Sequence, residues 1–357
     1  MSGTPVPRPR VAVSRTGLPG PAVGRLASRY NVTAWEGTAP PTSAELGTLV
    51  RGCEGLLVLG SDRVDAALLD AAGPGLRVVA LASMGYDGVD VDAAAARGVV
   101  VTHTPGVLAD TTADVAMALI LMARRRLGAS MASLRRGEWG AFSMDAFLGL
   151  DVQGATLGLI GYGQIAKALA RRAAGFGMRV QHHHPRRKED DGLSRWVTFD
   201  ELLRTSDVVS LHTPLTPETA GMIGAPELAR MKPTATLVNT GRGGIVDEEA
   251  LVAALRAGML HSAGLDVMVD EPRTDPDDRL FAEPHLVVLP HVGSATEATR
   301  AAMVELAASN IEAVLGGEAA PTPLPGTRAR PSGARKDGRL TWRSDAPGQS
   351  AHLRLGP

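Results

Sequence analysis

The 357-residue sequence predicts an α/β protein made of two parallel-sheet domains with a cleft between them. The chain is longer than one ordinary domain needs. Short apolar runs alternate with helical patterns along most of it, which is typical of parallel βαβ units. Hydrophobic residues make up 44% and charged residues 21%, the balance of a globular protein with a packed core.

The expected elements follow in order along the chain. The first strands lie at Val11–Val13, Gly55–Gly60, Leu76–Ala82 and Val99–Val101. A long apolar helix from about Asp110 to Arg125 then connects the two domains. The alternation restarts with strands at Leu157–Ile160, Arg179–His182, Asp207–Leu211, Thr236–Asn239, Ser262–Asp266 and Leu286–Leu289. A final helix, Ala295–Leu315, is long enough to return to the first domain, and the Pro-, Gly-, Ser- and Arg-rich remainder predicts a disordered tail.

Composition also indicates what the protein does not do. A net charge of −1 argues against nucleic-acid binding, which usually needs a strongly basic domain. The apolar runs are too short to span a bilayer, and residues 1–10 lack the apolar core of a signal peptide, so we expect a cytoplasmic protein. The single cysteine, Cys53, excludes an intrachain disulfide and is expected in a helix-to-strand turn.

A dinucleotide-binding motif follows the strand at Leu157–Ile160. Gly161 permits a tight turn, Gly163 lets the backbone approach a pyrophosphate, and Ala166 allows close helix packing. The next helix, starting near Gln164 and Ile165, directs its N-terminus at the phosphates. The glycine pattern alone is a weak signal. Its strand-turn-helix context makes the segment a predicted cofactor site.

The next strand ends in His182-His183-His184-Pro185-Arg186-Arg187. An NAD site would place a carboxylate here to bind the adenosine ribose, and the segment has none. Arg186 and Arg187, with His184 beside them, can instead hold a 2′-phosphate, which favours NADP over NAD. Two solvated surface arginines are an equally good interpretation. Consecutive histidines on a strand point to alternating faces and do not readily converge on one ion, so no metal site is expected.

Arg242, Glu271 and His291 are the candidate catalytic residues. Each lies at or just after a strand end in the second half of the chain, where ligands bind in open α/β sheets. The guanidinium of Arg242 can clamp the carboxylate and carbonyl oxygens of a substrate. A histidine held by a carboxylate has its protonated form stabilised and can act as a general acid. Each residue alone has an ordinary structural explanation, but their joint placement favours catalysis.

With these residues the chain resembles the D-isomer-specific 2-hydroxyacid dehydrogenase family over residues 10–316. The motifs that carry the resemblance are Gly158–Ala166, Val238–Gly243, Ala263–Val267 with Glu271-Pro272, and Pro290–Thr296. Segments Ser83–Asp87 and Leu108–Asp114 are most similar to glyoxylate/hydroxypyruvate reductases. The resemblance implies NAD(P)H-dependent reduction of glyoxylate or hydroxypyruvate to the D-2-hydroxy acid, and the reverse oxidation.

The resemblance also assigns roles to individual residues. It makes Arg242, Glu271 and His291 a catalytic triad, in which His291 donates a proton, Arg242 stabilises the growing charge on oxygen and Glu271 orients His291. The substrate would lie against Ser83, Met84 and Gly85, together with Arg242 and His291. Further cofactor contacts are implied for Thr112, Thr213, Pro214, Thr240 and Asp266.

The family's architecture divides the chain into two domains and a tail. A discontinuous, flavodoxin-like substrate domain would comprise residues 10–105 and 291–317, and a Rossmann NAD(P)-binding domain residues 106–290. Residues 318–357 would be the disordered tail. The resemblance also implies a homodimer, in which Trp139 either anchors the interface or enters the neighbouring subunit's pocket.

Two alternative functions stay open. A D-lactate- or D-3-phosphoglycerate-type dehydrogenase would use the same scaffold and the same triad, because one fold serves many 2-keto acids. Some relatives of the family are dinucleotide-sensing regulatory proteins that retain the triad. Turnover on a panel of substrates separates the first alternative, and nucleotide-dependent association with a partner would reveal the second.

Overall fold

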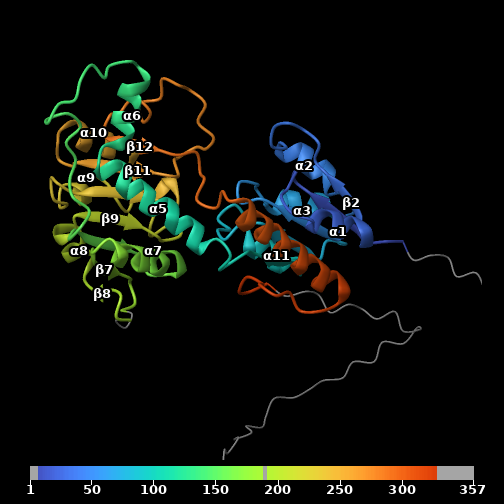
Figure 1. Ribbon diagram of the computed structural model, residues 1–357. Coiled ribbons are helices and arrows are strands. Elements are labelled where there is room, and N and C mark those ends of the chain that lie inside the picture. The colour runs from blue at the N-terminus through green and yellow to red at the C-terminus, as the bar shows by residue number, and fades with distance from the viewer. Residues whose placement is uncertain (1–6, 188–190, 328–357) are drawn as a thin grey trace, which may run out of the picture.

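The computed structural model describes residues 7–187 and 191–327, which form two α/β lobes (Figure 1). The chain passes between the lobes just before α5 (Ala109–Arg124) and again before α11 (Glu297–Gly316). Every pairing between named strands is parallel in both lobes. The α/β fold of two parallel-sheet domains is therefore confirmed.

The first lobe is built on a five-stranded sheet of order β2-β1-β3-β4-β5. Helix α11 packs on β3, β4 and β5, and its Val304, Ala307 and Ile311 share a core with Val11 and Val78. The last helix thus completes the hydrophobic core of a sheet formed by the first hundred residues. The elements of this lobe are β1 (Arg10–Val13), α1 (Ala22–Arg29), β2 (Asn31–Ala34), α2 (Ser43–Leu49), β3 (Gly55–Val58), α3 (Ala66–Ala72), β4 (Val78–Leu81), α4 (Val91–Ala96) and β5 (Val100–Thr102).

The second lobe contains a seven-stranded sheet of order β12-β11-β10-β9-β6-β7-β8. Helices α5 and α7 cover one face, and α8, α9 and α10 cover the other, so that two separate cores flank the sheet. The elements are α6 (Leu127–Arg135), β6 (Thr156–Ile160), α7 (Gln164–Gly175), β7 (Arg179–His183), β8 (Arg195–Trp196), α8 (Phe199–Thr205), β9 (Val208–Leu211), α9 (Ala225–Leu228), β10 (Thr236–Asn239), the 3₁₀ turn η1 (Gly243–Ile245), α10 (Glu248–Arg256), β11 (Ser262–Leu265) and β12 (Leu286–Val288).

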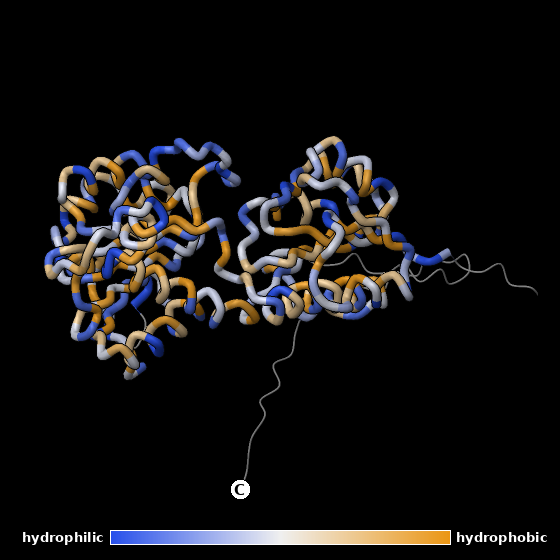
Figure 2. The backbone as a smooth tube through the Cα atoms, turned by 45° about the horizontal axis from the view of Figure 1, so that its top comes forward, coloured by the Kyte–Doolittle hydropathy of each residue, from blue (hydrophilic) through white to orange (hydrophobic). Residues whose placement is uncertain are grey.

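Burial on both faces explains why the central strands are visible in the sequence. Parallel strands between two layers of helices are apolar at every position, and all four residues of β3, β4, β9 and β10 are buried. Apolar segments run through the middle of both lobes in Figure 2. The sequence prediction missed β2 and β8, which are edge strands with exposed or half-buried residues.

The sequence analysis placed the start of the disordered tail too early, at residue 318. Residues 318–327 form a strap that lies against β5, with Leu324 only 2% exposed and its N–H donated to the Val101 carbonyl at 2.8 Å. Thr322 donates its hydroxyl to the carbonyl of His103 and accepts at its own carbonyl from the His103 N–H. The few apolar residues of this segment suffice because β5 offers them an open sheet edge. Residues 328–357, the rest of the predicted tail, lie outside the described residues.

None of the helices in the described ranges is long and apolar enough to cross a bilayer. Cys53 is buried and free, between α2 and β3, in the helix-to-strand turn where the sequence placed it. The division into residues 10–105 with 291–317 and residues 106–290 stays a prediction, which the packing of α11 on the first sheet supports.

Candidate active site

His291 and Glu271 form a hydrogen-bonded pair near the carboxyl edge of the second sheet. The His291 Nδ1 atom lies 2.6 Å from Glu271 Oε2, and Glu271 Oε1 accepts the Met268 N–H, also at 2.6 Å. The side chain of Glu271 is 27% exposed and that of His291 51%, so the carboxylate lies behind an accessible imidazole. Partial burial opposes ionisation of Glu271, but the hydrogen bonds from His291 and Met268 outweigh it and lower the pKa of the carboxyl.

The turn that carries His291 is held by Asp266. His291 has a left-handed backbone with φ of 52°, and its N–H is donated to the Asp266 carbonyl. The Asp266 carboxylate accepts the N–H groups of Val292 and Gly293, each at 2.7 Å. Asp266 is almost fully buried, and that burial raises its pKa despite both hydrogen bonds. An added Cβ at Gly293 would approach Asp266 and the Thr112 side chain, which shows that Thr112 lies at the same turn.

Arg242 follows β10 in a loop fixed by a buried asparagine. The Asn239 amide accepts the Gly241 N–H and donates to the Arg242 carbonyl, at 2.9 and 2.8 Å. The Arg242 guanidinium reaches across to the first lobe, where its Nε donates to Asp87 Oδ1 at 2.9 Å. It is also near enough to Glu271 to help lower the pKa of that carboxyl. Arg242 therefore lies between the His291–Glu271 pair and the first lobe.

The predicted substrate loop faces Arg242. Ser83, Met84 and Gly85 follow β4, and a Cβ added at Gly85 would overlap the Arg242 guanidinium at 1.7 Å. Only glycine allows this approach. Asp87, two residues further on, was not predicted as a site residue. The motif Ser83–Asp87 contains it, but nothing in the local sequence indicates a partner 155 positions away.

The residues predicted to hold a dinucleotide have a backbone conformation and unpaired polar groups that suit a bound dinucleotide. Gly161 has φ of +86°, and a Cβ there would lie 2.5 Å from the His212 carbonyl oxygen. No atom lies within 4 Å of a Cβ built at Gly163, and α7 starts at the next residue, Gln164. In the described part of the chain, the buried hydroxyls of Thr213 and Thr240 have no hydrogen-bond partner. These unpaired groups, at the ends of β9 and β10, fit a bound polar ligand.

The segment predicted to select the cofactor lies after β7. Arg186 and Arg187 are exposed, and the Arg187 guanidinium lies over the Trp196 ring, 5.4 Å from its centre. The His184 ring turns back on its own segment, where Nδ1 lies 3.2 Å from the Arg186 nitrogen. Ile165 is half-buried at the start of α7, and Pro214 is exposed after Thr213.

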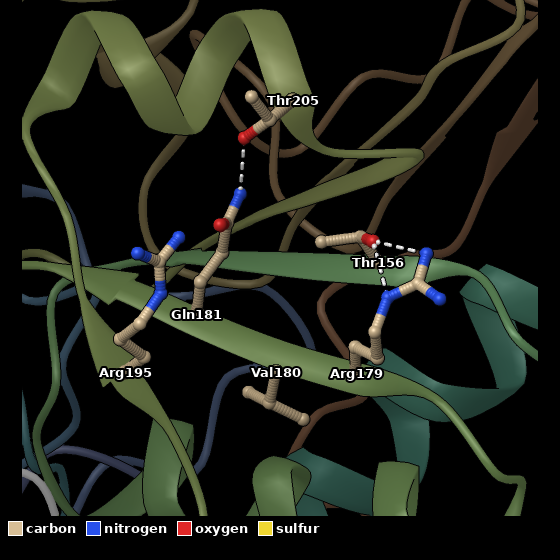
Figure 3. A pocket seen from close by; sticks show the side chains of 6 residues that line it. All are labelled: Thr156, Arg179, Val180, Gln181, Arg195 and Thr205. Carbon is tan, nitrogen blue, oxygen red and sulfur yellow. Dashed lines mark hydrogen bonds between the residues drawn. The ribbon is translucent and has the colours of Figure 1, made fainter.

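A pocket of about 270 Å³ lies at the amino ends of the strands of the second sheet, away from the His291–Glu271 pair at the carboxyl ends. Figure 3 shows Arg179, Gln181 and Arg195 pointing to the same side of the strands, with Val180 turned away. The residues around it are Thr156, Arg179, Val180, Gln181, Arg195 and Thr205, which come from the starts of β6, β7 and β8 and the end of α8. None of these is a predicted site residue, and Arg195 is paired with Glu201 at 3.0 Å.

Comparison with known proteins gives the family. Residues 117–293 match the family model described as D-isomer specific 2-hydroxyacid dehydrogenase, NAD binding domain. A glyoxylate reductase from Korarchaeum cryptofilum is 44% identical over 318 residues, which covers 88% of this chain and 95% of that protein. The matched residues include the glycine turn, Arg242, Glu271 and His291.

Two solved structures extend the likeness to three dimensions. A protein from Thermus thermophilus has a TM-score of 0.83 at 48% identity, covering 88% of this chain and 99% of that one. The NADPH-dependent glyoxylate/hydroxypyruvate reductase of Sinorhizobium meliloti, solved with NADP and malonate, has a TM-score of 0.80 at 36% identity, covering 90% and 98%. The chain thus carries a nicotinamide dinucleotide-binding domain, and it belongs to the D-isomer specific 2-hydroxyacid dehydrogenase family of oxidoreductases.

Proposed function

We propose that this protein reduces glyoxylate or hydroxypyruvate to the D-2-hydroxy acid with NADPH, and catalyses the reverse oxidation. The observation that carries the proposal is the His291–Glu271 pair beside Arg242, in a lobe whose glycine turn at Gly161 and Gly163 fits a dinucleotide. The names of the relatives from Korarchaeum and Sinorhizobium support the choice of substrate. D-Lactate- or phosphoglycerate-type activity and a sensing role remain the alternatives.

Each member of the proposed triad has a task that follows from its contacts. The reduced nicotinamide supplies the hydride when it is bound. His291, whose Nδ1 is held by Glu271, donates the proton on Nε2 to the carbonyl oxygen of the keto acid. Arg242 binds that oxygen and the adjacent carboxylate through its planar fork, which stabilises the charge that develops on the oxygen. Glu271 keeps the imidazole oriented through the hydrogen bond to Nδ1.

Asp87 gives Arg242 a second partner before substrate arrives. Their ion pair is partly exposed, at 25% and 37% of the two side chains, and such pairs are weak. A substrate carboxylate can therefore take the place of Asp87 at little cost. We infer that the backbone amides of Ser83, Met84 and Gly85 then bind the same carboxylate from the first lobe, so that the substrate bridges the two lobes.

The cofactor would be held by the strand ends of the second lobe. The glycine turn at Gly161 and Gly163, with Gln164 and Ile165, would carry the pyrophosphate, and the remaining contacts would come from Thr112, His184, Thr213, Pro214, Thr240 and Asp266. The two exposed cations at Arg186 and Arg187, without a carboxylate at the end of β7, support NADP over NAD.

We also propose a homodimer, formed through an apolar arm of the second lobe. Side chains on α6 and the segment after it are exposed although they are hydrophobic, which is unusual for a monomer surface. They are Leu127, Met131, Leu134, Trp139, Phe142, Met144, Phe147 and Leu148. The arm is the surface that a second copy would cover, and Trp139 is either an interface anchor or a contribution to the partner's pocket. A cytoplasmic location is part of the same proposal, because a chain with one cysteine does not depend on disulfides for its stability.

Nicotinamide absorbance tests the proposal directly. Purified protein is offered glyoxylate, hydroxypyruvate, pyruvate and 3-phosphohydroxypyruvate, each with NADPH and with NADH. Faster oxidation of NADPH with glyoxylate or hydroxypyruvate is expected. Preference for pyruvate or the phosphorylated acid would replace the substrate assignment, and cofactor binding without any turnover would favour the sensing protein.

Light scattering on the wild type and on Leu134→Asp tests the dimer, which the charged variant should dissociate.

A further inference from the structure

Tyr162 occupies the middle of the glycine turn and is almost fully buried. Its hydroxyl donates to Asp191, at 2.9 Å from Oδ1 and 3.0 Å from Oδ2. Lys167, in the first turns of α7, pairs with the same carboxylate at 3.2 Å. Partial burial opposes ionisation of Asp191, but the hydrogen bonds from Tyr162, Leu193 and Lys167 lower its pKa, so the acceptor is a carboxylate at neutral pH. The residue between the two glycines is thus fixed to a segment far from it in sequence.

The histidine run at the end of β7 is tied to that same segment. The His182 ring stacks on Tyr162, with centres 3.8 Å apart and planes 11° from parallel. His182 Nδ1 lies 2.9 Å from Ser194 Oγ, and His183 Nδ1 lies 3.0 Å from the Val197 carbonyl oxygen. Trp196 donates its indole N–H to the His184 carbonyl at 3.2 Å. The three histidines therefore each contact the returning segment Asp191–Val197.

These contacts enclose the residues proposed to select the cofactor. In the sequence, His184 to Arg187 connect the end of β7 to the part of the chain that leads into the returning segment. Trp196 contacts this stretch at both ends, through the His184 carbonyl and the Arg187 guanidinium. The Tyr162–Asp191 hydrogen bond connects this arrangement to the turn that would hold the pyrophosphate. Binding costs conformational entropy for every group that it orders, backbone as well as side chain. A backbone that is already fixed therefore lowers the entropy cost of placing an arginine against a phosphate.

We propose that the hydrogen bond between Tyr162 and Asp191, which we call the latch, determines how strongly the protein prefers a dinucleotide with a 2′-phosphate over one without. Tyr162 and Asp191 are positioning residues. They act through the backbone of His184 to Arg187, which the latch and the His182 stack hold against the glycine turn. The inference rests on the proposed use of NADPH and adds the residues that make Arg186 and Arg187 selective.

Calorimetric titration with 2′,5′-ADP and with 5′-AMP tests the latch without turnover. Tyr162→Phe removes the hydroxyl and keeps the ring that stacks on His182. We expect it to weaken 2′,5′-ADP binding about fivefold, the low end of typical coupling between sites, and to leave 5′-AMP binding nearly unchanged. Asp191→Asn keeps an acceptor for the hydroxyl and should lose less than Asp191→Ala. Tyr30→Phe, in the first lobe, is the matched control and should bind both nucleotides as the wild type does.

A double-mutant cycle separates the latch from general damage. If the latch acts as proposed, Asp191→Ala costs less 2′,5′-ADP affinity in the Tyr162→Phe background than in the wild type, because both substitutions remove the same hydrogen bond. Equal weakening of both nucleotides, or additive losses, would overturn it. A wild-type protein that binds both nucleotides equally would overturn the NADP assignment and the selective role together, whereas a wild-type preference that survives Tyr162→Phe would overturn the latch alone.

Discussion

The imidazole of His291 and the carboxylate of Glu271 meet at 2.6 Å, although 20 positions separate them in the chain. Two backbone contacts fix the pair. The Met268 N–H holds Glu271, and the Asp266 carbonyl holds the turn at His291. The pair is therefore organised before a substrate is present, which is what a proton donor to a carbonyl oxygen requires.

Removing the side chain of His291 or Arg242, the two proposed partners of the substrate oxygen, should slow catalysis strongly without preventing cofactor binding. We expect His291→Ala and Arg242→Ala to lower kcat/KM for glyoxylate by a factor of about 100 or more, because each loses an interaction made in the transition state. Nucleotide affinity, followed by fluorescence titration, should stay close to that of the wild type. Arg279→Ala, which breaks an exposed ion pair with Glu249, is the control. Full activity in either variant would refute the mechanism.

Asp266→Asn should impair catalysis through the turn at His291. A carboxylate can accept both N–H groups of Val292 and Gly293, whereas an amide has one acceptor oxygen and directs its NH₂ at the other donor. We expect kcat/KM to fall about tenfold, as the cost of one unsatisfied buried group suggests. Steady-state kinetics on Asp266→Asn and on the exposed Asp92→Asn would measure this. Equal rates in the two variants would show that the turn does not depend on the Asp266 charge.

The free energy of unfolding should depend on pH through His212. Packing around its half-buried ring lowers the pKa to about 4, whereas an unfolded histidine titrates near 6.5. Between these values the unfolded chain binds a proton that the folded chain does not. The contribution of His212 is therefore present above about pH 6.5 and lost as the pH falls toward 4. Urea unfolding from pH 7.5 to 4.5 should show a flatter profile for His212→Asn. Identical slopes would contradict the prediction.

The strap after α11 should contribute to stability. A chain that ends at Gly317 lacks the buried Leu324 and the hydrogen bonds of Thr322 to His103 and of Thr327 to Val101, at and just after β5. Burial of a leucine side chain contributes about 1.5 to 3 kcal/mol. A chain that ends at Thr327 keeps these contacts and is the matched control. Calorimetry should give a lower Tm for the shorter chain, and equal Tm values would show that the strap is not needed.

The central strands and the candidate site were predictable because their signals are local. Strands buried on both faces are continuously apolar, and the glycine turn at Gly161 and Gly163 is required by backbone geometry alone. Strand ends also locate Arg242 and His291, since parallel strands bring their carboxyl ends to one edge. The edge strands β2 and β8 have no such signal, because half of their environment is solvent.

The sequence by itself determined the fold class, the family and the residues that converge on one edge of the second sheet. Only the tertiary structure decided their partners: Asp87 for Arg242, Asp191 for Tyr162, and β5 for the strap at residues 318–327. The physical reason is distance along the chain. Apolar periodicity and glycine turns are local constraints, whereas an ion pair or a hydrogen bond between distant residues depends on how the lobes and loops pack, which no single segment encodes.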